Sequence, residues 1–173
     1  LAEKGYKVTG IDISKKQIEN AKKINGIKNT TYLNMDVRDI QLEKSDFNAG
    51  MCMWTTYNYL SQNEDFEKFI KCVYNHLCQG GIFVLDSKNI PALEKNRIYK
   101  RDNKTEELDL ELLICKRVIE NIQNSQYFYF MKRNGKKEFY MDEEFVRFYY
   151  LNEIDEIVNK YFDIIDVYGD FDM

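Results

Sequence analysis

The sequence predicts an α/β fold in which a parallel sheet with crossover helices is followed by an antiparallel insertion. Over residues 6–86, short apolar runs alternate with helical patterns, and this alternation is typical of a parallel sheet. Over about 99–150, apolar and polar residues alternate one by one, as they do in half-buried antiparallel strands. We therefore expect a partial α/β core at 1–98, a three- to four-stranded insertion at 99–150, and a C-terminal helix and strand at 151–173 that return to the core.

The core is expected to contain four strands and two helices. The predicted strands are the apolar or β-branched runs at 6–11, 30–35, 47–54 and 82–85. The run at 47–54 is nearly all apolar, which is typical of a strand covered on both faces. Ser14 and Gln17 form a capping box for a helix that stops near Asn25-Gly26. Apolar residues recur on one helical face over 66–77, and Gly80-Gly81 is expected to end that second helix.

After Pro91, the only proline, the predicted elements change. A strand is expected at 108–114, and the runs at 126–132 and 137–141 flank Asn134-Gly135, a strong signal for a two-residue hairpin. A further strand is expected at 144–150. Asn152 is expected to cap a helix over 153–162, and 162–168 is expected to be a last strand.

One predicted strand of the insertion is rich in aromatic residues. Tyr127 and Tyr129 share one of its faces, and Phe128 and Phe130 share the other. One pair is expected to line a substrate pocket and the other to pack on the sheet. The alternation alone does not say which pair does which.

The composition is that of a globular domain, with 44% hydrophobic and 31% charged residues in a chain of 173. A net charge of −4 without a dominant basic block argues against a nucleic-acid-binding surface. No apolar run is long enough to span a bilayer, and the opening residues lack the basic-then-apolar pattern of a signal segment, so we expect neither feature. The four cysteines (Cys52, Cys72, Cys78 and Cys115) lack CxxC spacing. We therefore expect neither a metal site nor disulfides, and a reducing, cytoplasmic setting.

Three of the predicted parallel strands are followed by an acid: Asp12, Asp36 and Asp86. Ligands of open α/β sheets bind beyond the carboxyl ends of the strands. A carboxylate at such a position can accept hydrogen bonds from both hydroxyls of a ribose. An acid there can equally cap the next helix or turn, so both interpretations stay open for each residue.

Four segments in this order carry a resemblance to a known family: VTGIDIS (8–14), NMDVRDI (34–40), FNAGMCMWTTYNYL (47–60) and HLCQGGIFVLDSKN (76–89). Together they resemble the motifs of class I S-adenosylmethionine-dependent methyltransferases. The resemblance is closest to small bacterial members with an antiparallel insertion, similar to glycine and amino-sugar N-methyltransferases. It implies a Rossmann-like sheet, S-adenosylmethionine as the cofactor, and a small-molecule acceptor that is methylated at nitrogen rather than at oxygen.

The resemblance also implies roles for individual residues. Asp12 would hold the ribose hydroxyls and Ile13 would pack on the adenine. Asp36 would accept the adenine amine, with Val37 beside it. The remaining implied contacts are Met53 and Trp54 with the methionine part of the cofactor, and Thr55, Tyr57, Asn58 and Asp86 with the substrate. No catalytic base is singled out, and the single histidine, His76, is expected to be structural.

The sequence departs from the family at both ends. The glycine-rich loop and the first strand have no counterpart, because LAEKG (1–5) is expected to be the end of the helix after that loop, with Gly5 as its C-cap. The family's last strand is also missing. Since the first strand lies in the middle of the family's sheet, its loss predicts a gap with unpaired backbone groups. We expect the isolated chain to bind cofactor poorly and to be marginally stable.

Two other functions share part of this pattern. A nicotinamide-dependent oxidoreductase also uses an acid after its second strand. Asp36 and the segment MWTTYNYL would have no obvious role in such an enzyme, which argues against this alternative. A non-catalytic binding module, either degenerate or completed by a separate chain, would account for the missing loop. Competition between the two cofactors separates the first alternative from methyl transfer.

Overall fold

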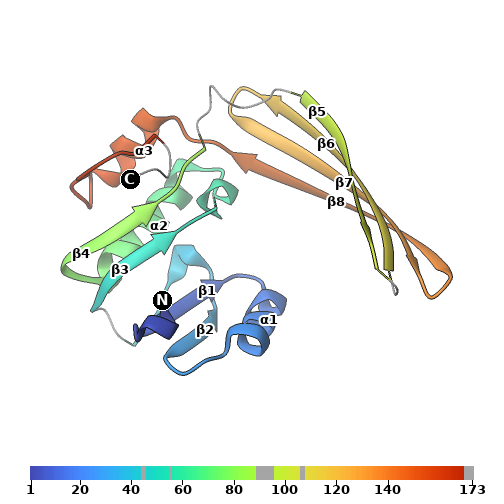
Figure 1. Cartoon of the computed structure of the whole chain (residues 1–173). Helices are drawn as coiled ribbons and strands as arrows, with labels where there is room; N and C mark the ends of the chain where they lie inside the picture. The colour runs from blue at the N-terminus through green and yellow to red at the C-terminus, as the bar shows by residue number, and fades with distance from the viewer. Residues whose placement is uncertain (44–45, 55, 89–95, 106–107, 170–173) are drawn as a thin grey trace. The chain divides into compact units, whose positions relative to one another are not determined.

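The computed structural model describes residues 1–43, 46–54, 56–88, 96–105 and 108–169 (Figure 1). The chain forms two compact units. Unit 1 comprises Leu1–Gly50, Asn63–Phe83 and Ile157–Met173, and unit 2 comprises Met51–Gln62 and Val84–Glu156. Unit 1 thus contains most of the predicted parallel part, and unit 2 contains the insertion.

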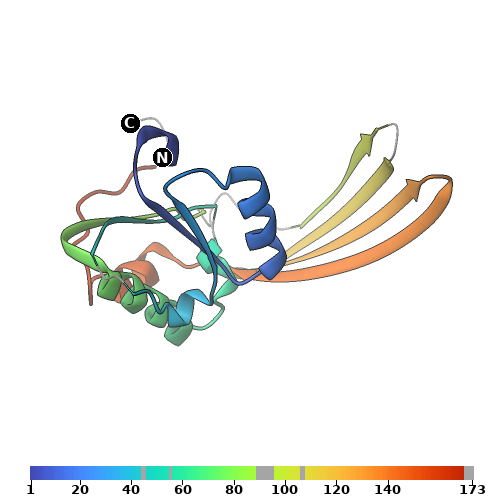
Figure 2. The ribbon, with the colours of Figure 1, turned by 90° about the horizontal axis from the view of Figure 1, so that it is seen from below.

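Unit 1 begins with a strand–helix–strand element. Strands β1 (Val8–Asp12) and β2 (Thr30–Asn34) are parallel, in a register that pairs Asp12 with Asn34. Helix α1 (Lys15–Asn25) connects them and lies beside both (Figure 2). As predicted, the Ser14 hydroxyl caps α1 by accepting a hydrogen bond from the backbone N–H of Gln17. The short 3₁₀ helix η1 (Ala2–Lys4) ends at Gly5 in the left-handed conformation, which confirms the predicted C-cap.

A second strand–helix–strand element follows. Strands β3 (Phe47–Cys52) and β4 (Leu77–Leu85) form a two-stranded sheet and run in the same direction (Figure 1), with helix α2 (Asn63–His76) between them in the chain. A Cβ atom at Gly50 would lie 3.2 Å from the ring of Phe83 and 3.4 Å from Val73. Helix α2 and β3 therefore pack closely, over a core that includes Phe66, Phe69 and Ile70.

The parallel sheet is divided as the sequence predicts. Within the described residues, β1 pairs only with β2 and β3 pairs only with β4. This is the predicted gap between the two halves of the sheet. The predicted covering of β3 on both faces is wrong, because the side chain of Met51 on β3 is exposed. An apolar run indicates a strand, but it does not show whether other elements pack on both faces of that strand.

Two further predictions for unit 1 are wrong. Gly80-Gly81 does not end α2, because the helix stops at His76 and β4 starts at Leu77. Gly80 instead gives β4 a bend at φ 76°. The residues at 162–168 form no strand, because no partner strand in the described part of the chain hydrogen-bonds with them. Phe162 packs its ring against Phe83, with 5.8 Å between the ring centroids.

Unit 2 contains the predicted antiparallel insertion as a four-stranded sheet in the order β5-β6-β7-β8, which curves along its length (Figure 2). The strands are β5 (Asn96–Lys104), β6 (Leu108–Ile119), β7 (Ile122–Arg133) and β8 (Lys136–Arg147). Asn134 and Gly135 both have positive φ, at 50° and 79°, as a type I′ hairpin requires. The predicted hairpin is therefore confirmed.

The end of the insertion differs from the prediction. Residues 144–147 continue β8 and are not a separate strand. Helix α3 (Leu151–Val158) begins before Asn152, so Asn152 is not its cap. Glu153 reaches back instead, and its carboxylate accepts a hydrogen bond from the backbone N–H of Tyr150 at 2.8 Å. This is half of a capping box, which a search for an Asn or Ser cap overlooks. No helix in the described ranges is long and apolar enough to cross a membrane.

Candidate functional site

The carboxyl end of β1 presents one acid and one exposed apolar side chain. Asp12 Oδ1 accepts a hydrogen bond from the backbone N–H of Ser14 at 2.7 Å. The amide of Asn34 donates to the backbone oxygens of both Asp12, at 2.9 Å, and Ile13, at 2.7 Å. Ile13 is 69% exposed. The turn after β1 is therefore fixed from the neighbouring strand, and it offers a carboxylate beside an apolar surface.

Asn34 was not singled out from the sequence. Asn34 is the register partner of Asp12 in the parallel pair of β1 and β2. The predicted pairing of these two strands could therefore have pointed to it. In the described part of the chain, Ser14 N–H is the one hydrogen-bond donor to the Asp12 side chain. The capping and the ligand-binding interpretations of Asp12 are therefore compatible, because a carboxylate has about four acceptor positions.

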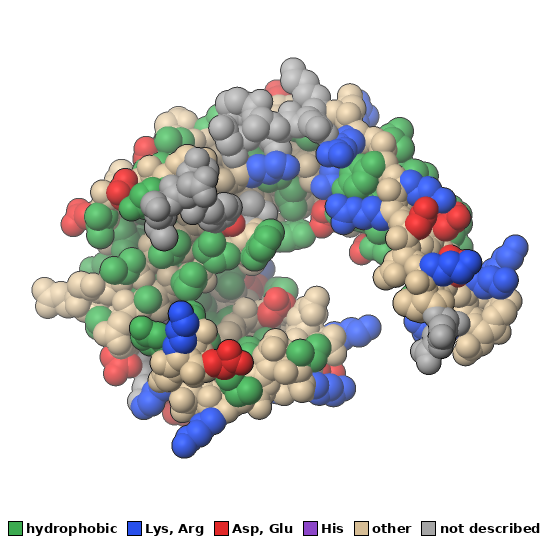
Figure 3. Space-filling view, in the orientation of Figure 1, with side chains coloured by type: hydrophobic (Ala, Val, Ile, Leu, Met, Phe, Trp, Pro, Cys, Tyr) green, Lys and Arg blue, Asp and Glu red, His purple; other side chains and the backbone are tan. Residues whose placement is uncertain are grey.

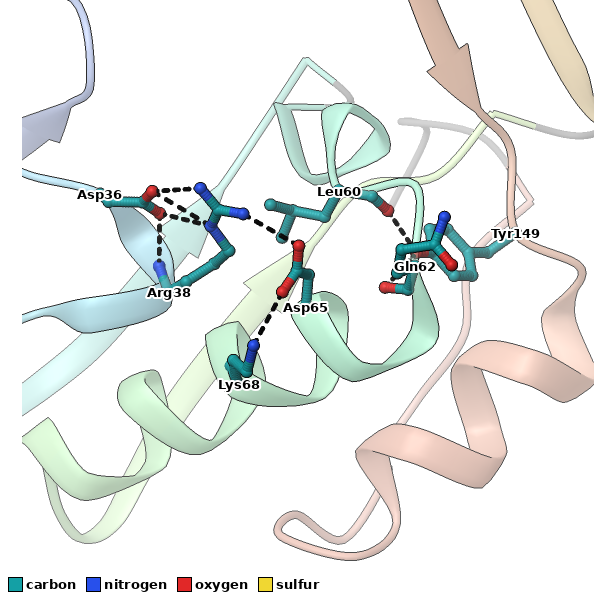
Figure 4. A network of polar contacts seen from close by, with 7 residues as sticks. All are labelled: Asp36, Arg38, Leu60, Gln62, Asp65, Lys68 and Tyr149. Atoms are coloured by element: carbon teal, nitrogen blue, oxygen red, sulfur yellow. Dashed lines mark hydrogen bonds and ion pairs between the residues drawn. The ribbon is translucent and has the colours of Figure 1, made fainter.

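Asp36 belongs to a network of four charged residues (Figure 4). It begins the 3₁₀ helix η2 (Val37–Asp39) by accepting a hydrogen bond from the backbone N–H of Arg38 at 2.9 Å. The Arg38 guanidinium also pairs with Asp36 at 2.5 Å and with Asp65 on α2 at 2.9 Å. Lys68 completes the network at 3.0 Å from Asp65. The side-chain hydrogen bond from Arg38 lowers the pKa of Asp36, so its carboxylate stays ionised, and Val37 lies half-buried beside it.

In unit 2, Trp54 and Asp86 are directly joined. The backbone N–H of Trp54 donates to Asp86 Oδ2 at 2.7 Å, and the backbone N–H of Asp86 donates to the oxygen of Cys52 at 3.2 Å. Trp54 has a φ of 62°, which is rare for a large side chain, and it is 90% exposed. Met53 is half-buried beside it. These contacts fix the loop after β3, and the indole ring is exposed within the described part of the chain.

Tyr57 and Asn58 pack inside unit 2, on the 3₁₀ helix η3 (Thr56–Tyr59). They are 1% and 0% exposed. The Asn58 amide donates to the backbone oxygen of Arg147, and the ring of Tyr57 lies 5.7 Å from that of Tyr149. Burial raises the pKa of Tyr57 to about 12. The structure gives both residues a packing role, and their contact with substrate stays a prediction. Thr55 lies outside the described residues.

The segment after η3 is held by residues that sequence reasoning missed. The hydroxyl of Tyr149 donates to the backbone oxygen of Leu60 and, at 3.2 Å, to that of Gln62 (Figure 4). Arg147 donates to the oxygen of Ser61 at 3.0 Å and forms an ion pair with Glu153. These residues join the end of β8 to the loop that carries the implied substrate contacts.

The predicted site residues thus fall into two groups. The group in unit 1 contains Asp12, Ile13, Asp36 and Val37. The group in unit 2 contains Met53, Trp54, Tyr57, Asn58 and Asp86. Within the described residues, no group of three or more His, Cys, Asp and Glu side chains is arranged to hold a metal ion.

Comparison with known proteins identifies the fold. Residues 1–81 match a family model described as "Methyltransferase domain". The sugar N-methyltransferase KedS8 from Streptoalloteichus sp. ATCC 53650 superposes with a TM-score of 0.80 at 14% identity, over 88% of this chain and 61% of its own. The chain has the class I methyltransferase fold. The fold class predicted from the sequence is therefore confirmed, and residues 1–81 have the predicted similarity to methyltransferase domains.

Two other proteins are similar to this chain, one in structure and one in sequence. CalS10 from Micromonospora echinaspora, described as an amino pentose methyltransferase with SAM bound, superposes with a TM-score of 0.74 at 14% identity, over 89% of this chain and 64% of its own. The Bacillus subtilis (strain 168) protein named "Putative methyltransferase YqeM" is 33% identical over 87 residues, which are 50% of this chain. The match spans 35% of that relative's length.

Proposed function

We propose that this chain is part of an S-adenosylmethionine-dependent methyltransferase that acts on a small-molecule amine. The turn after β1 carries the proposal, because it sets the half-buried carboxylate of Asp12 beside the exposed side chain of Ile13 at the carboxyl end of a parallel strand. This pair suits a nucleoside, which offers two ribose hydroxyls as donors and a flat apolar base. The match of residues 1–81 to a methyltransferase domain and the bound SAM of CalS10 support it.

The chain's own residues would bind and orient the reactants. S-adenosylmethionine supplies a methyl group on a sulfonium, and its transfer is an in-line displacement that depends mainly on positioning. Asp12 accepts from the ribose hydroxyls, and Asp36, which Arg38 keeps ionised, accepts from the adenine amine. Trp54 and Met53 contact the methionine part, and Asp86 positions Trp54 through its backbone N–H.

The acceptor is proposed to be a small molecule methylated at nitrogen. This rests on the printed descriptions of two solved neighbours, a sugar N-methyltransferase and an amino pentose methyltransferase. Thr55, Tyr57, Asn58 and Asp86 remain proposed substrate contacts. The cytoplasmic setting and the absence of nucleic-acid partners remain predictions from the sequence.

Calorimetric titration of S-adenosylmethionine into the protein that contains this chain tests the proposal, with NAD⁺ as the competing ligand. We expect saturable binding at micromolar concentration that NAD⁺ does not displace. A folded protein that binds NAD⁺ instead would establish the oxidoreductase alternative. A folded protein that binds neither would establish the non-catalytic module.

A further inference from the structure

Unit 2 carries a second group of polar side chains, which the proposed cofactor contacts do not use. Glu144 on β8 accepts hydrogen bonds from the hydroxyl of Tyr59, at 2.8 Å, and from that of Tyr127 on β7. Tyr129 stacks on Tyr127, with 6.4 Å between ring centroids and 22° between ring planes. Asp142 is the register partner of Tyr127, so it lies on the same face of the sheet. We call Tyr59, Tyr127, Tyr129, Asp142 and Glu144 the tyrosine–carboxylate patch.

The patch lies where this face of the sheet changes from covered to open. Ser125, the register partner of Glu144, is 0% exposed, and it accepts a hydrogen bond from the buried amide of Gln123. Further along the same face, Tyr140 is 53% exposed. Tyr127 and Glu144 are half-buried between these two levels. The face therefore reaches solvent beside the patch, and a small ligand can contact it there.

The two acids of the patch lack a cation. Lys and Arg side chains lie along this sheet in Figure 3, and some pair with acids, as Lys100 pairs with Asp102 and Glu111. Among the described residues, however, neither Glu144 nor Asp142 forms an ion pair. Burial and then the hydrogen bond to Glu144 raise the pKa of Tyr59 to about 12, and the same causes raise the pKa of Tyr127. Both tyrosines therefore stay neutral and leave the negative charge of the patch in place.

We propose that the tyrosine–carboxylate patch binds the positively charged amino group of the methyl acceptor, an inference that rests on the proposed function. An ammonium has three N–H donors, and each oxygen of Glu144 keeps one acceptor position beyond its tyrosine bond. The ring faces of Tyr127 and Tyr129 attract a cation through their quadrupoles. A neutral alcohol of the same shape gains neither charge–charge attraction nor cation–π contact, so the patch selects amines over hydroxyl compounds.

Glucosamine and glucose are suitable probes, because they differ by one amino group, and their binding is followed by ligand-observed NMR at a mildly acidic pH. We expect the protein to bind glucosamine about tenfold more tightly than glucose. Glu144→Gln should abolish this preference. Glu143→Gln is the matched control, since Glu143 is the next residue, lies on the opposite face and bonds instead to the amides of Asn124 and Gln126. Glu143→Gln should keep the preference.

A second variant, Tyr59→Phe, removes one hydroxyl that holds Glu144 and should reduce the preference even if Glu144→Gln does not fold. Equal affinity for the two sugars, or a preference that survives both Glu144→Gln and Tyr59→Phe in folded protein, would overturn the inference. Titration with S-adenosylmethionine separates the two levels of the argument. If the protein binds the cofactor but does not prefer the amine, the proposed role of the patch is wrong and the proposed methyltransferase function still stands. If the protein prefers the amine but does not bind the cofactor, the proposed methyltransferase function is wrong and the patch is a cation-binding site.

Discussion

The carboxylate of Asp86 accepts a hydrogen bond from the backbone N–H of Trp54 at 2.7 Å, and this bond joins the loops that follow β4 and β3. It holds Trp54 at a φ of 62°, where Cβ is crowded by the backbone. Strained residues persist only where the surroundings fix them, and they are frequent at functional sites. The Asp86–Trp54 pair therefore gives the exposed indole a defined position.

The strain at Trp54 predicts an unusual order of stability between two variants. Trp54→Gly should be more stable than Trp54→Ala by roughly 1 kcal/mol, because glycine adopts a left-handed backbone without a Cβ penalty. Urea denaturation followed by circular dichroism measures the difference. Ile13 is a matched control, since it is also exposed but has no positive φ. At that position alanine should be the more stable, and the same order at Trp54 would contradict the left-handed conformation.

Much of the fold could be predicted because its determinants are local. Ser14 caps α1 and Asn134-Gly135 forms the hairpin through contacts within a few residues, so short patterns are sufficient. The end of α2 could not be predicted from Gly80-Gly81. A glycine pair is compatible with a helix end and with a bent strand alike, and the pairing of β4 with β3 selects the strand.

Some residues of the candidate site could likewise be predicted from the sequence, and others could not. Asp12, Asp36 and Asp86 could be found because each follows a predicted strand. Glu144 and Tyr149 could not, since their partners Tyr59 and Leu60 lie 85 and 89 residues away. Such pairs form because β8 packs beside η3, and a local sequence pattern does not predict a contact between segments so far apart in the chain.

Asp12 is predicted to be the main anchor of the cofactor. In the complete protein that contains this chain, Asp12→Ala should weaken binding of S-adenosylmethionine by roughly 1.5–3 kcal/mol, about tenfold to a hundredfold, because the ribose hydroxyls lose a charged acceptor. Calorimetry measures the affinity. Asp39→Ala, on the exposed side of η2, is the control and should leave the affinity unchanged. An Asp12→Ala protein with wild-type affinity would restrict Asp12 to its bond with Ser14.

The Asp36–Arg38 pair should make unit 1 sensitive to acid. Its hydrogen bond with Arg38 lowers the pKa of Asp36 below the ordinary value of 3.8. The pair therefore stabilises the folded state fully above that value, and the contribution is lost as the pH falls through the lower, folded-state pKa. Arg38→Gln should be less stable than wild type at neutral pH, and urea denaturation should show this difference becoming smaller as the pH falls below 3.8. Lys28→Gln, which alters an exposed lysine that forms no ion pair within the described residues, should show no such trend. Because Arg38 also pairs with Asp65, a difference that does not change with pH would mean that neither of the two ion pairs of Arg38 stabilises the protein in solution.

Tyr149 should be the most sensitive hydroxyl in unit 2. Its buried O–H donates to the backbone oxygens of Leu60 and Gln62, so Tyr149→Phe leaves a buried carbonyl without its donor. We expect a loss of about 1–3 kcal/mol in the free energy of unfolding, the usual cost of an unsatisfied buried group. Tyr150→Phe is the matched control, because Tyr150 is exposed and its hydroxyl makes no hydrogen bond within the described residues. Its effect should stay within about 0.5 kcal/mol. Equal losses in the two variants would show that the loop after η3 is held by other contacts, and the arrangement of Tyr59 beside Glu144 would then not depend on Tyr149.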